Sequence, residues 1–189
     1  MTRESVRIAF LIAALNELEI KSIDIGNAYL NAPAREKVYT TAGLEFGLGK
    51  VGRPVIIQQA SYGLKTSGAA WHAQLMETLH SMDFTPSLAD PDVWMRAASK
   101  ANGLQYYEYL LVYIDDVLIL SHNPEPILRC IEKSYRLKGP ASDPQTYLGA
   151  YIKQWSIEND HRNIWSISSS HHIKEAIANL ERHLLSEGL

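Results

Sequence analysis

The segment Tyr106–Ser121, YYEYLLVYIDDVLILS, is a long apolar run that two adjacent aspartates, Asp115 and Asp116, interrupt. The flanks Leu110–Ile114 and Val117–Leu120 are aliphatic, partly β-branched and of strand length, which predicts two buried strands joined by a hairpin. An ionised carboxylate buried without a partner is costly, and two neighbouring ones also repel each other. The pair is therefore expected at a turn open to water or facing a positive charge, for which Mg²⁺ with its oxygen ligands is a natural candidate.

The alternative is that Asp115–Asp116 is only the polar tip of a hairpin, since two-residue loops favour Asp, Asn and Gly. A tight turn of Asp-Asp without glycine is strained, because a positive φ is costly for any residue with a Cβ. Strain of this kind is tolerated most readily where function requires it. Both interpretations stay open until a third acid from elsewhere in the chain is found.

The composition is that of an ordinary globular chain. It has 189 residues, of which 46% are hydrophobic and 21% charged, enough for one well-buried core. The single cysteine, Cys130, excludes an intramolecular disulfide and fits a reducing compartment, so we expect an intracellular protein that is not secreted. The apolar stretch Ile8–Leu15 is too short to span a membrane. A net charge of −3 is unusual for a nucleic-acid-binding surface.

Helical and strand patterns alternate along the chain, which predicts an α+β fold: an antiparallel sheet with helices packed on one face. We expect the first helix, Thr2–Leu18, to be apolar nearly all round and deeply buried. The other helices are predicted from Thr66 or Ser67 to Met82, from Asn123–Pro124 onward with Ile127, Ile131 and Tyr135 on one face, and around Ile173, Ile177, Leu180 and Leu184. The other strands are predicted at Ile20–Leu30, Val38–Thr40, Val55–Gln58, Asp92–Arg96, and in a hairpin of Tyr147–Ile157 and Ile164–Ser168 through the turn Glu158–Asn163.

Asp24 lies in the predicted strand Ile20–Leu30 and is the one acid, apart from the hairpin pair, that we place inside a strand core. A lone aspartate in a strand usually faces solvent. The following residues favour a site instead, because Gly26 allows close approach and the aromatic Tyr29 follows at a short, fixed spacing.

The segments SIDIGNAYLNA, SYGLKTSGAAW, LLVYIDDVLIL and YLGAYI occur in the order of the polymerase motifs of reverse transcriptases. The chain most resembles the copia-type long-terminal-repeat retrotransposon enzymes, in which Tyr-Gly-Leu-Lys and Tyr-Val-Asp-Asp segments recur in this order. The resemblance covers nearly the whole chain, from about Ser5 to the last helix.

The resemblance implies a reverse-transcriptase palm that adds nucleotides to a primer with two Mg²⁺ ions, Mn²⁺ being the alternative ion. Asp24, Asp115 and Asp116 match the family's catalytic, metal-binding carboxylates. Two such ions stabilise the attacking and leaving oxygens of phosphoryl transfer together. The nearby dications also remove the repulsion between the acids.

Four further residues match the nucleotide pocket of the family: Ile25, Tyr29, Gly63 and Lys65. Tyr29 matches the position that stacks beneath the incoming sugar and excludes a ribose 2′-hydroxyl, and the alternative is a core tyrosine. Tyr62 stands where retroviral enzymes have glutamine, so its role is open.

Leu148 and Gly149 resemble the hairpin that holds the primer end, and the alternative is an ordinary hairpin with a bulge glycine. By resemblance, residues 1–157 form the palm with partial fingers, and residues 158–189 end the palm or begin a thumb or connection segment. The family's basic fingers precede the first helix, so we expect them to be largely missing here. Lys65 is then the only basic residue that we place near the pocket.

The partners implied are an RNA or DNA template-primer, deoxynucleoside triphosphates and the other Pol regions (fingers, thumb, ribonuclease H and integrase), with no membrane. The function implied is RNA-directed DNA synthesis in retrotransposition. The alternative is a degenerate, non-catalytic palm-like remnant that acts at most as a binding module.

Overall fold

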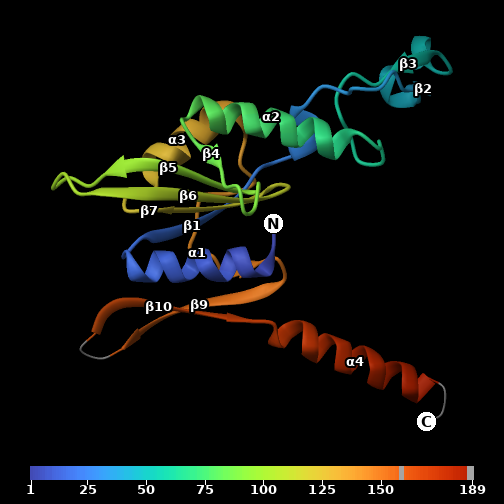
Figure 1. The fold of residues 1–189 in the computed structure, drawn as a ribbon. Coiled ribbons are helices and arrows are strands. Elements are labelled where there is room, and N and C mark those ends of the chain that lie inside the picture. Colours follow the sequence, from blue (N-terminus) through green and yellow to red (C-terminus); the bar gives the residue numbers. More distant parts are fainter. Residues whose placement is uncertain (158–159, 187–189) are drawn as a thin grey trace.

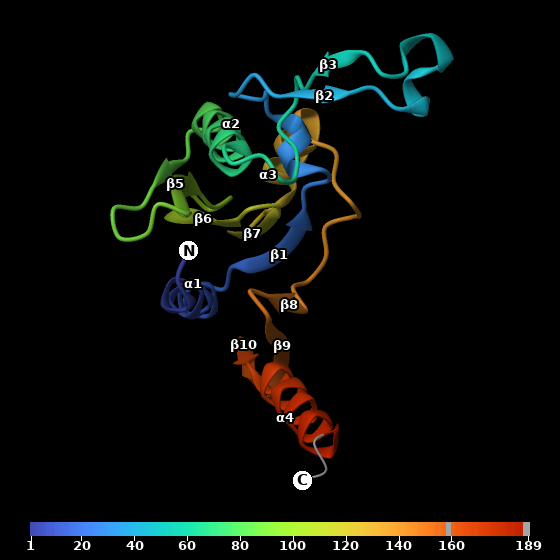
Figure 2. The same cartoon turned by 90° about the vertical axis from the view of Figure 1, so that its right-hand side faces the viewer.

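The computed structural model describes residues 1–157 and 160–186. Its centre is a five-stranded antiparallel sheet in the order β1-β7-β6-β5-β4 (Figures 1 and 2). Helices and antiparallel sheets are mixed, so the predicted α+β class is confirmed. The strands of this sheet are β1 (Glu19–Asp24), β4 (Thr85–Pro86), β5 (Val93–Ser99), β6 (Gln105–Tyr113) and β7 (Asp116–Ser121).

The predicted hairpin is present as β6 and β7. These strands pair from Tyr109↔Leu120 to Tyr113↔Asp116, so the turn between them consists of Ile114 and Asp115. Asp116 is therefore the first residue of a strand, and only one of the two aspartates lies in the turn.

Helices cover both faces of the sheet, and the prediction that they pack on one face is wrong. Helices α2 (Ser67–Ser81) and α3 (Glu125–Ser134) lie on one side of the sheet, and α1 (Arg3–Leu15) lies on the other (Figure 1). The reason is that β6 and β7 are apolar on both faces, so both must be covered. Their residues divide between the α2–α3 core (Leu110, Val112, Val117, Ile119) and the α1 core (Leu111, Leu118, Leu120).

Helix α1 is buried on one face only, contrary to the expected burial all round. Val6, Ala9, Phe10 and Ala13 point into the core, whereas Ile8, Leu11 and Leu15 on the same helix are exposed. The described part of the chain therefore covers only some of the apolar side chains of this helix.

Between β1 and α2 the chain forms an arm that projects away from the sheet (Figures 1 and 2). The predicted strand Ile20–Leu30 ends at Asp24, because Asn27 adopts a left-handed conformation (φ 51°) and a 3-10 turn follows. The two short predicted strands are confirmed, with boundaries shifted by one residue or two. The 3-10 turn, η1 (Ala28–Asn31), packs against α2, and the projecting arm beyond it contains β2 (Tyr39–Thr41), η2 (Leu44–Phe46), η3 (Leu48–Lys50) and β3 (Pro54–Ile56).

A second sheet, β10-β9-β8, packs beneath α1 (Figure 1). It consists of β8 (Thr146–Tyr147), β9 (Ala150–Ile157) and β10 (Asp160–Ser168), and α4 (Ser170–Ser186) follows and extends away from the body. The predicted strand from Tyr147 is interrupted by a turn at Leu148–Gly149, where both residues have positive φ. The predicted turn Glu158–Asn163 is wrong for residues 160–163, which belong to β10, and residues 158–159 lie outside the described residues.

The third predicted helix, α3, begins at Glu125 with Pro124 at the capping position, one residue later than predicted. In the described ranges 1–157 and 160–186, no helix combines the length and the hydropathy that a membrane span requires.

Candidate active site

The three aspartates meet at one end of the central sheet. Asp24, the last residue of β1, is the cross-strand partner of Asp116, the first residue of β7. Asp115 precedes Asp116 in the turn, and its backbone carbonyl accepts a hydrogen bond of 2.8 Å from the Ile25 N–H. Register alone thus brings the acid of β1 to the acids of the hairpin, as the sequence predicted.

Lys138 lies between two of these carboxylates. The segment after α3 runs along the outer edge of β1 through the bridges Ile25↔Leu137 and Ser22↔Ser142, and the Lys138 N–H donates to the Asp24 carbonyl. This places the Lys138 Nζ 2.8 Å from Asp24 Oδ1 and 2.9 Å from Asp115 Oδ2. Hydrogen bonds to Asp24 and then to Asp115 raise the pKa of the Lys138 ammonium. The expectation that Lys65 is the only basic residue near the site is wrong.

Asp116 has a different environment from its two neighbours. Burial, and then repulsion from Asp115 and Asp24, raise the pKa of the Asp116 carboxyl above its usual value. Asp116 lines a cavity on the α1 side of the sheet together with Arg3 and Tyr113. The Lys138 ammonium pairs with only two of the three carboxylates, so the ionised site has an excess of negative charge that favours a further cation.

The donor set fits a divalent metal only in part. Among residues 1–157 and 160–186, no three Asp, Glu, His or Cys side chains are grouped so that they could hold one ion. Asp24 and Asp115 nevertheless bind the same ammonium through oxygens, which are the ligands that Mg²⁺ prefers. These two residues can hold a metal ion in place of the Lys138 ammonium. Asp116 lies beside them and has to turn toward them to become a third ligand.

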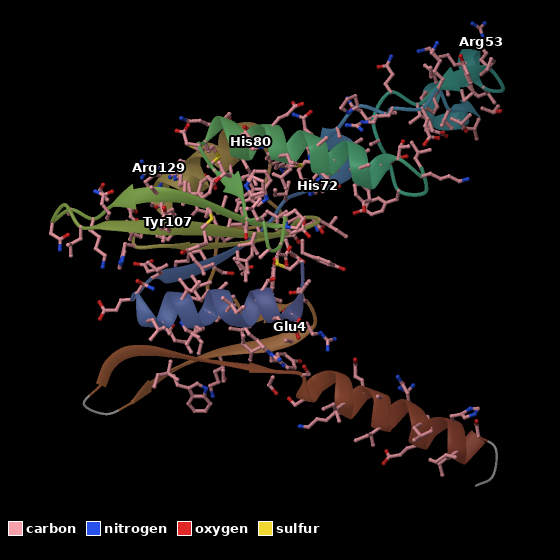
Figure 3. All side chains as sticks on the ribbon, in the orientation of Figure 1. Glu4, Arg53, His72, His80, Tyr107 and Arg129 are labelled. Atoms are coloured by element: carbon pink, nitrogen blue, oxygen red, sulfur yellow. The ribbon has the colours of Figure 1, made fainter. Side chains whose placement is uncertain are left out.

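Tyr29 lies close to the Ile114–Asp115 turn. It lines a cavity of about 180 Å³ with Trp71, His72 and Ile114, among others, and His72 lies on the side of α2 that faces the sheet (Figure 3). Its ring contacts that of Tyr62, with centroids 4.7 Å apart. Tyr29 is half-buried and also packs on the core, so its position is compatible with a pocket wall and with the core alternative.

The other residues assigned to the nucleotide pocket differ in their surroundings. Ile25 is 0% exposed as a whole residue, so it supports the site from within the core and its amide is already bonded to the Asp115 carbonyl. Gly63 has φ 94° and open space around its Cα, so backbone conformation accounts for the glycine. Lys65 is exposed on the loop before α2.

The structure brings the Leu148–Gly149 turn to the aspartates. Both residues line the cavity that Asp116 and Tyr113 also line. Leu148 has φ 48° and Gly149 has φ 73°, so the turn between β8 and β9 is tight.

Two residues at the site were missed from the sequence. Lys138 follows α3 in an irregular segment, and no local pattern distinguishes it from other surface lysines. Trp71 ends the SYGLKTSGAAW segment, and no local pattern predicts a polar contact for an aromatic residue within a helix. Its indole Nε1 donates a hydrogen bond of 2.7 Å to the Ile114 carbonyl in the turn.

The chain belongs to the reverse transcriptase (RNA-dependent DNA polymerase) family, whose sequence profile matches residues 1–181. This confirms the resemblance on which the site assignment was based.

Similar proteins include the retrovirus-related Pol polyproteins of plant transposons. The chain is 28% identical over 167 residues to that of transposon TNT 1-94 from Nicotiana tabacum, covering 85% of this chain and 12% of the relative. It is 30% identical over 123 residues to that of transposon RE1 from Arabidopsis thaliana, covering 64% of this chain and 8% of the relative. The chain therefore spans only a small part of the length of these relatives.

Proposed function

We propose that this chain is the catalytic palm of the RNA-directed DNA polymerase in a copia-type retrotransposon Pol polyprotein. The observation that carries the proposal is the convergence of Asp24 and Asp115 on one cation, with Asp116 beside them, in a chain of the reverse transcriptase family. A cation at this end of the sheet requires several nearby carboxylates, and β1, β7 and the turn before β7 each supply one.

Nucleotide addition joins the primer 3′-hydroxyl to the α-phosphate and releases pyrophosphate, so negative charge grows on the oxygens at both ends of the reacting group. Two bound Mg²⁺ ions, or Mn²⁺, supply Lewis-acid stabilisation of these oxygens. In the proposal, Asp24 and Asp115 hold the ions, and Asp116 adds negative charge nearby.

Lys138 keeps Asp24 and Asp115 together when no metal is bound, since its ammonium neutralises part of their repulsion. Tyr29 forms the wall against the sugar, with Tyr62 packed on its ring. Leu148 and Gly149 line the same cavity as Asp116, and in the proposal they hold the primer end. Gly63 contributes backbone to the pocket, and Lys65 contributes a positive charge at its edge. The buried Ile25 supports the pocket through the hydrogen bond from its amide to the Asp115 carbonyl.

The partners in this proposal are a template-primer, deoxynucleoside triphosphates and the remaining Pol regions, inside the cell. We keep the division into a palm over residues 1–157 and the beginning of a thumb or connection segment over residues 158–189 as part of the proposal.

A second candidate is a palm that has lost catalysis and acts at most as a binding module. It is favoured by the absence, among the described residues, of a three-ligand metal group. Both candidates keep Asp24 beside Asp115, and they differ in whether metal binding leads to synthesis.

The test is primer extension by a chimaera in which residues 1–189 replace the matching segment of the TNT 1-94 polyprotein. Asp115→Asn is expected to lower extension at least about 100-fold, because it removes a direct metal ligand, and even outer partners of metal ligands contribute 10–100-fold. The matched control is Asp143→Asn, since Asp143 pairs with Lys21 at the surface and touches no site residue.

Normal extension by the Asp115→Asn chimaera would contradict the proposal. An inactive chimaera that still binds Mn²⁺ through Asp24 and Asp115 would support the second candidate instead. In an active chimaera, Tyr29→Val is expected to raise the ratio of ribonucleotide to deoxynucleotide incorporation, and an unchanged ratio would assign Tyr29 to the core.

A further inference from the structure

The turn that carries Asp115 has a strained backbone. Ile114 has φ 56°, in the left-handed region that a β-branched side chain rarely occupies. Such a conformation persists only where the surrounding structure determines it, and it is concentrated at functional sites.

Two hydrogen bonds hold the carbonyls of this turn. The Ile25 N–H donates to the Asp115 carbonyl over 2.8 Å, and the Trp71 indole donates to the Ile114 carbonyl over 2.7 Å. The first is a backbone bond from the chain just after β1. The second comes from a side chain on α2, so it fixes the orientation of the peptide that joins Ile114 to Asp115.

The Trp71 ring is itself held in place by the core. It is 2% exposed and packs edge-to-face on Tyr135, with ring centroids 5.2 Å apart. The Tyr135 hydroxyl returns to α2, where it hydrogen-bonds with the Thr78 hydroxyl at 2.6 Å. A buried indole with so little freedom can impose its hydrogen-bond direction on the more exposed turn.

The position of Asp115 depends on this peptide, because its carboxylate reaches the Lys138 Nζ at 2.9 Å beside Asp24. A different orientation of the Ile114 carbonyl turns the Asp115 side chain away from Asp24. We propose that Trp71 is a positioning residue, whose indole N–H holds the turn so that Asp115 faces Asp24. Its consequence for catalysis rests on the proposed function, whereas its effect on the turn does not.

The test compares Trp71→Phe with Trp94→Phe in the 189-residue chain. Trp94 is also fully buried but lies on β5, where its cross-strand partner is Leu110. Both variants therefore replace a buried indole by a smaller phenyl ring, and only Trp71→Phe also removes the hydrogen bond to the turn. Hydrogen exchange at the Ile25 amide reports the turn, since this amide donates to Asp115. The Ser22 amide donates to the Ser142 carbonyl on the same segment and serves as the internal reference.

Trp71→Phe is expected to increase exchange at Ile25 about tenfold relative to Ser22, whereas Trp94→Phe is expected to change both amides alike. Equal ratios in the two variants would overturn the proposal, because Trp71 would then act through packing alone. Adding Ile114→Gly to Trp71→Phe is expected to restore part of the Ile25 protection, since glycine accepts the positive φ without strain.

A second measurement separates this inference from the proposed function. Titration with Mn²⁺, followed by electron paramagnetic resonance, is expected to give about tenfold weaker binding in Trp71→Phe than in Trp94→Phe. If the unaltered chain binds no Mn²⁺ while the exchange result holds, the metal assignment fails and the positioning role stands. If Mn²⁺ binding is equal in the two variants and the exchange ratio is unchanged, the positioning role fails and the metal assignment stands.

Discussion

Strands β6 and β7 carry a cluster of charged side chains at each end, and the two clusters are neutralised very differently. At one end, Glu108 is 5% exposed and accepts hydrogen bonds from Arg96, Ser121 and Tyr106. At the other end, Asp24 and Asp115 share a single lysine with Asp116 beside them, and the side chains of Asp24 and Lys138 are well exposed.

The Glu108 cluster is closed. Arg96 is the cross-strand partner of Glu108, donates to it over 2.7 Å, donates also to the Met82 carbonyl at the end of α2, and stacks over Phe84. Its positive charge at a helix C-terminus is favourable in itself. One acid, one base and two hydroxyls satisfy each other, so nothing in the cluster calls for a ligand.

The aspartate cluster is open, because its negative charges outnumber its cations and it borders a cavity. The comparison teaches that an acid within an apolar strand does not by itself indicate a site. The balance of charge and the access of solvent distinguish a structural acid from one that binds a cation.

The largest expected effect is on stability at the closed end. Glu108→Ala removes the buried acceptor of Arg96, Tyr106 and Ser121 at once, which is expected to lower the free energy of unfolding by about 3–5 kcal/mol. Asp24→Asn, at the open end, is expected to change it by less than about 1 kcal/mol without metal, because exposed ion pairs contribute little. Urea unfolding of both variants measures the difference. Equal losses would mean that the two ends are not distinct.

A smaller effect is expected from metal at the open end. Mn²⁺ at 100 times its dissociation constant is expected to raise the free energy of unfolding by about 2.7 kcal/mol, because only the native chain brings Asp24 to Asp115. Thermal unfolding with and without Mn²⁺ checks this in the unaltered chain, in Asp115→Asn and in the control Asp143→Asn. The stabilisation by Mn²⁺ should be lost in Asp115→Asn and kept in Asp143→Asn. If Mn²⁺ still stabilises Asp115→Asn, the ion binds elsewhere.

The smallest expected effect is the pH dependence of Asp116. Its pKa is raised in the native state by burial and by its two acidic neighbours, so the native chain binds this proton more tightly than the unfolded chain. Stability from this group is therefore present at low pH, and it falls as the pH rises from the unfolded pKa of about 3.9 through the raised native value.

Asp116→Asn removes that loss, so the stability of the variant relative to the unaltered chain is expected to increase across this window and then to level off. The change is expected to be the smallest of the three, since Asp116 is partly solvated. Urea unfolding at several pH values without metal measures it. A relative stability that decreases with pH would show that the Asp116 carboxylate is stabilised in the native state.

Much of the fold followed from local sequence. The β6–β7 hairpin, the order of the helices and the short strands of the arm were predicted because each depends on residues within a few positions of one another. Glu108 was missed because the predicted strand began at Leu110, whereas β6 begins at Gln105. The prediction that the helices pack on one face was wrong, because local periodicity does not reveal that the side chains on both faces of β6 and β7 have to be buried.

The sequence by itself singled out the acids of the candidate site, since Asp24, Asp115 and Asp116 stand in ordered segments typical of a reverse transcriptase. Tertiary structure alone decided how they are held. Lys138 is 114 residues from Asp24 and Trp71 is 43 residues from Ile114, yet each contacts its partner directly. The physical reason is that such contacts depend on strand register and helix packing over the whole chain, which no local pattern of residues encodes.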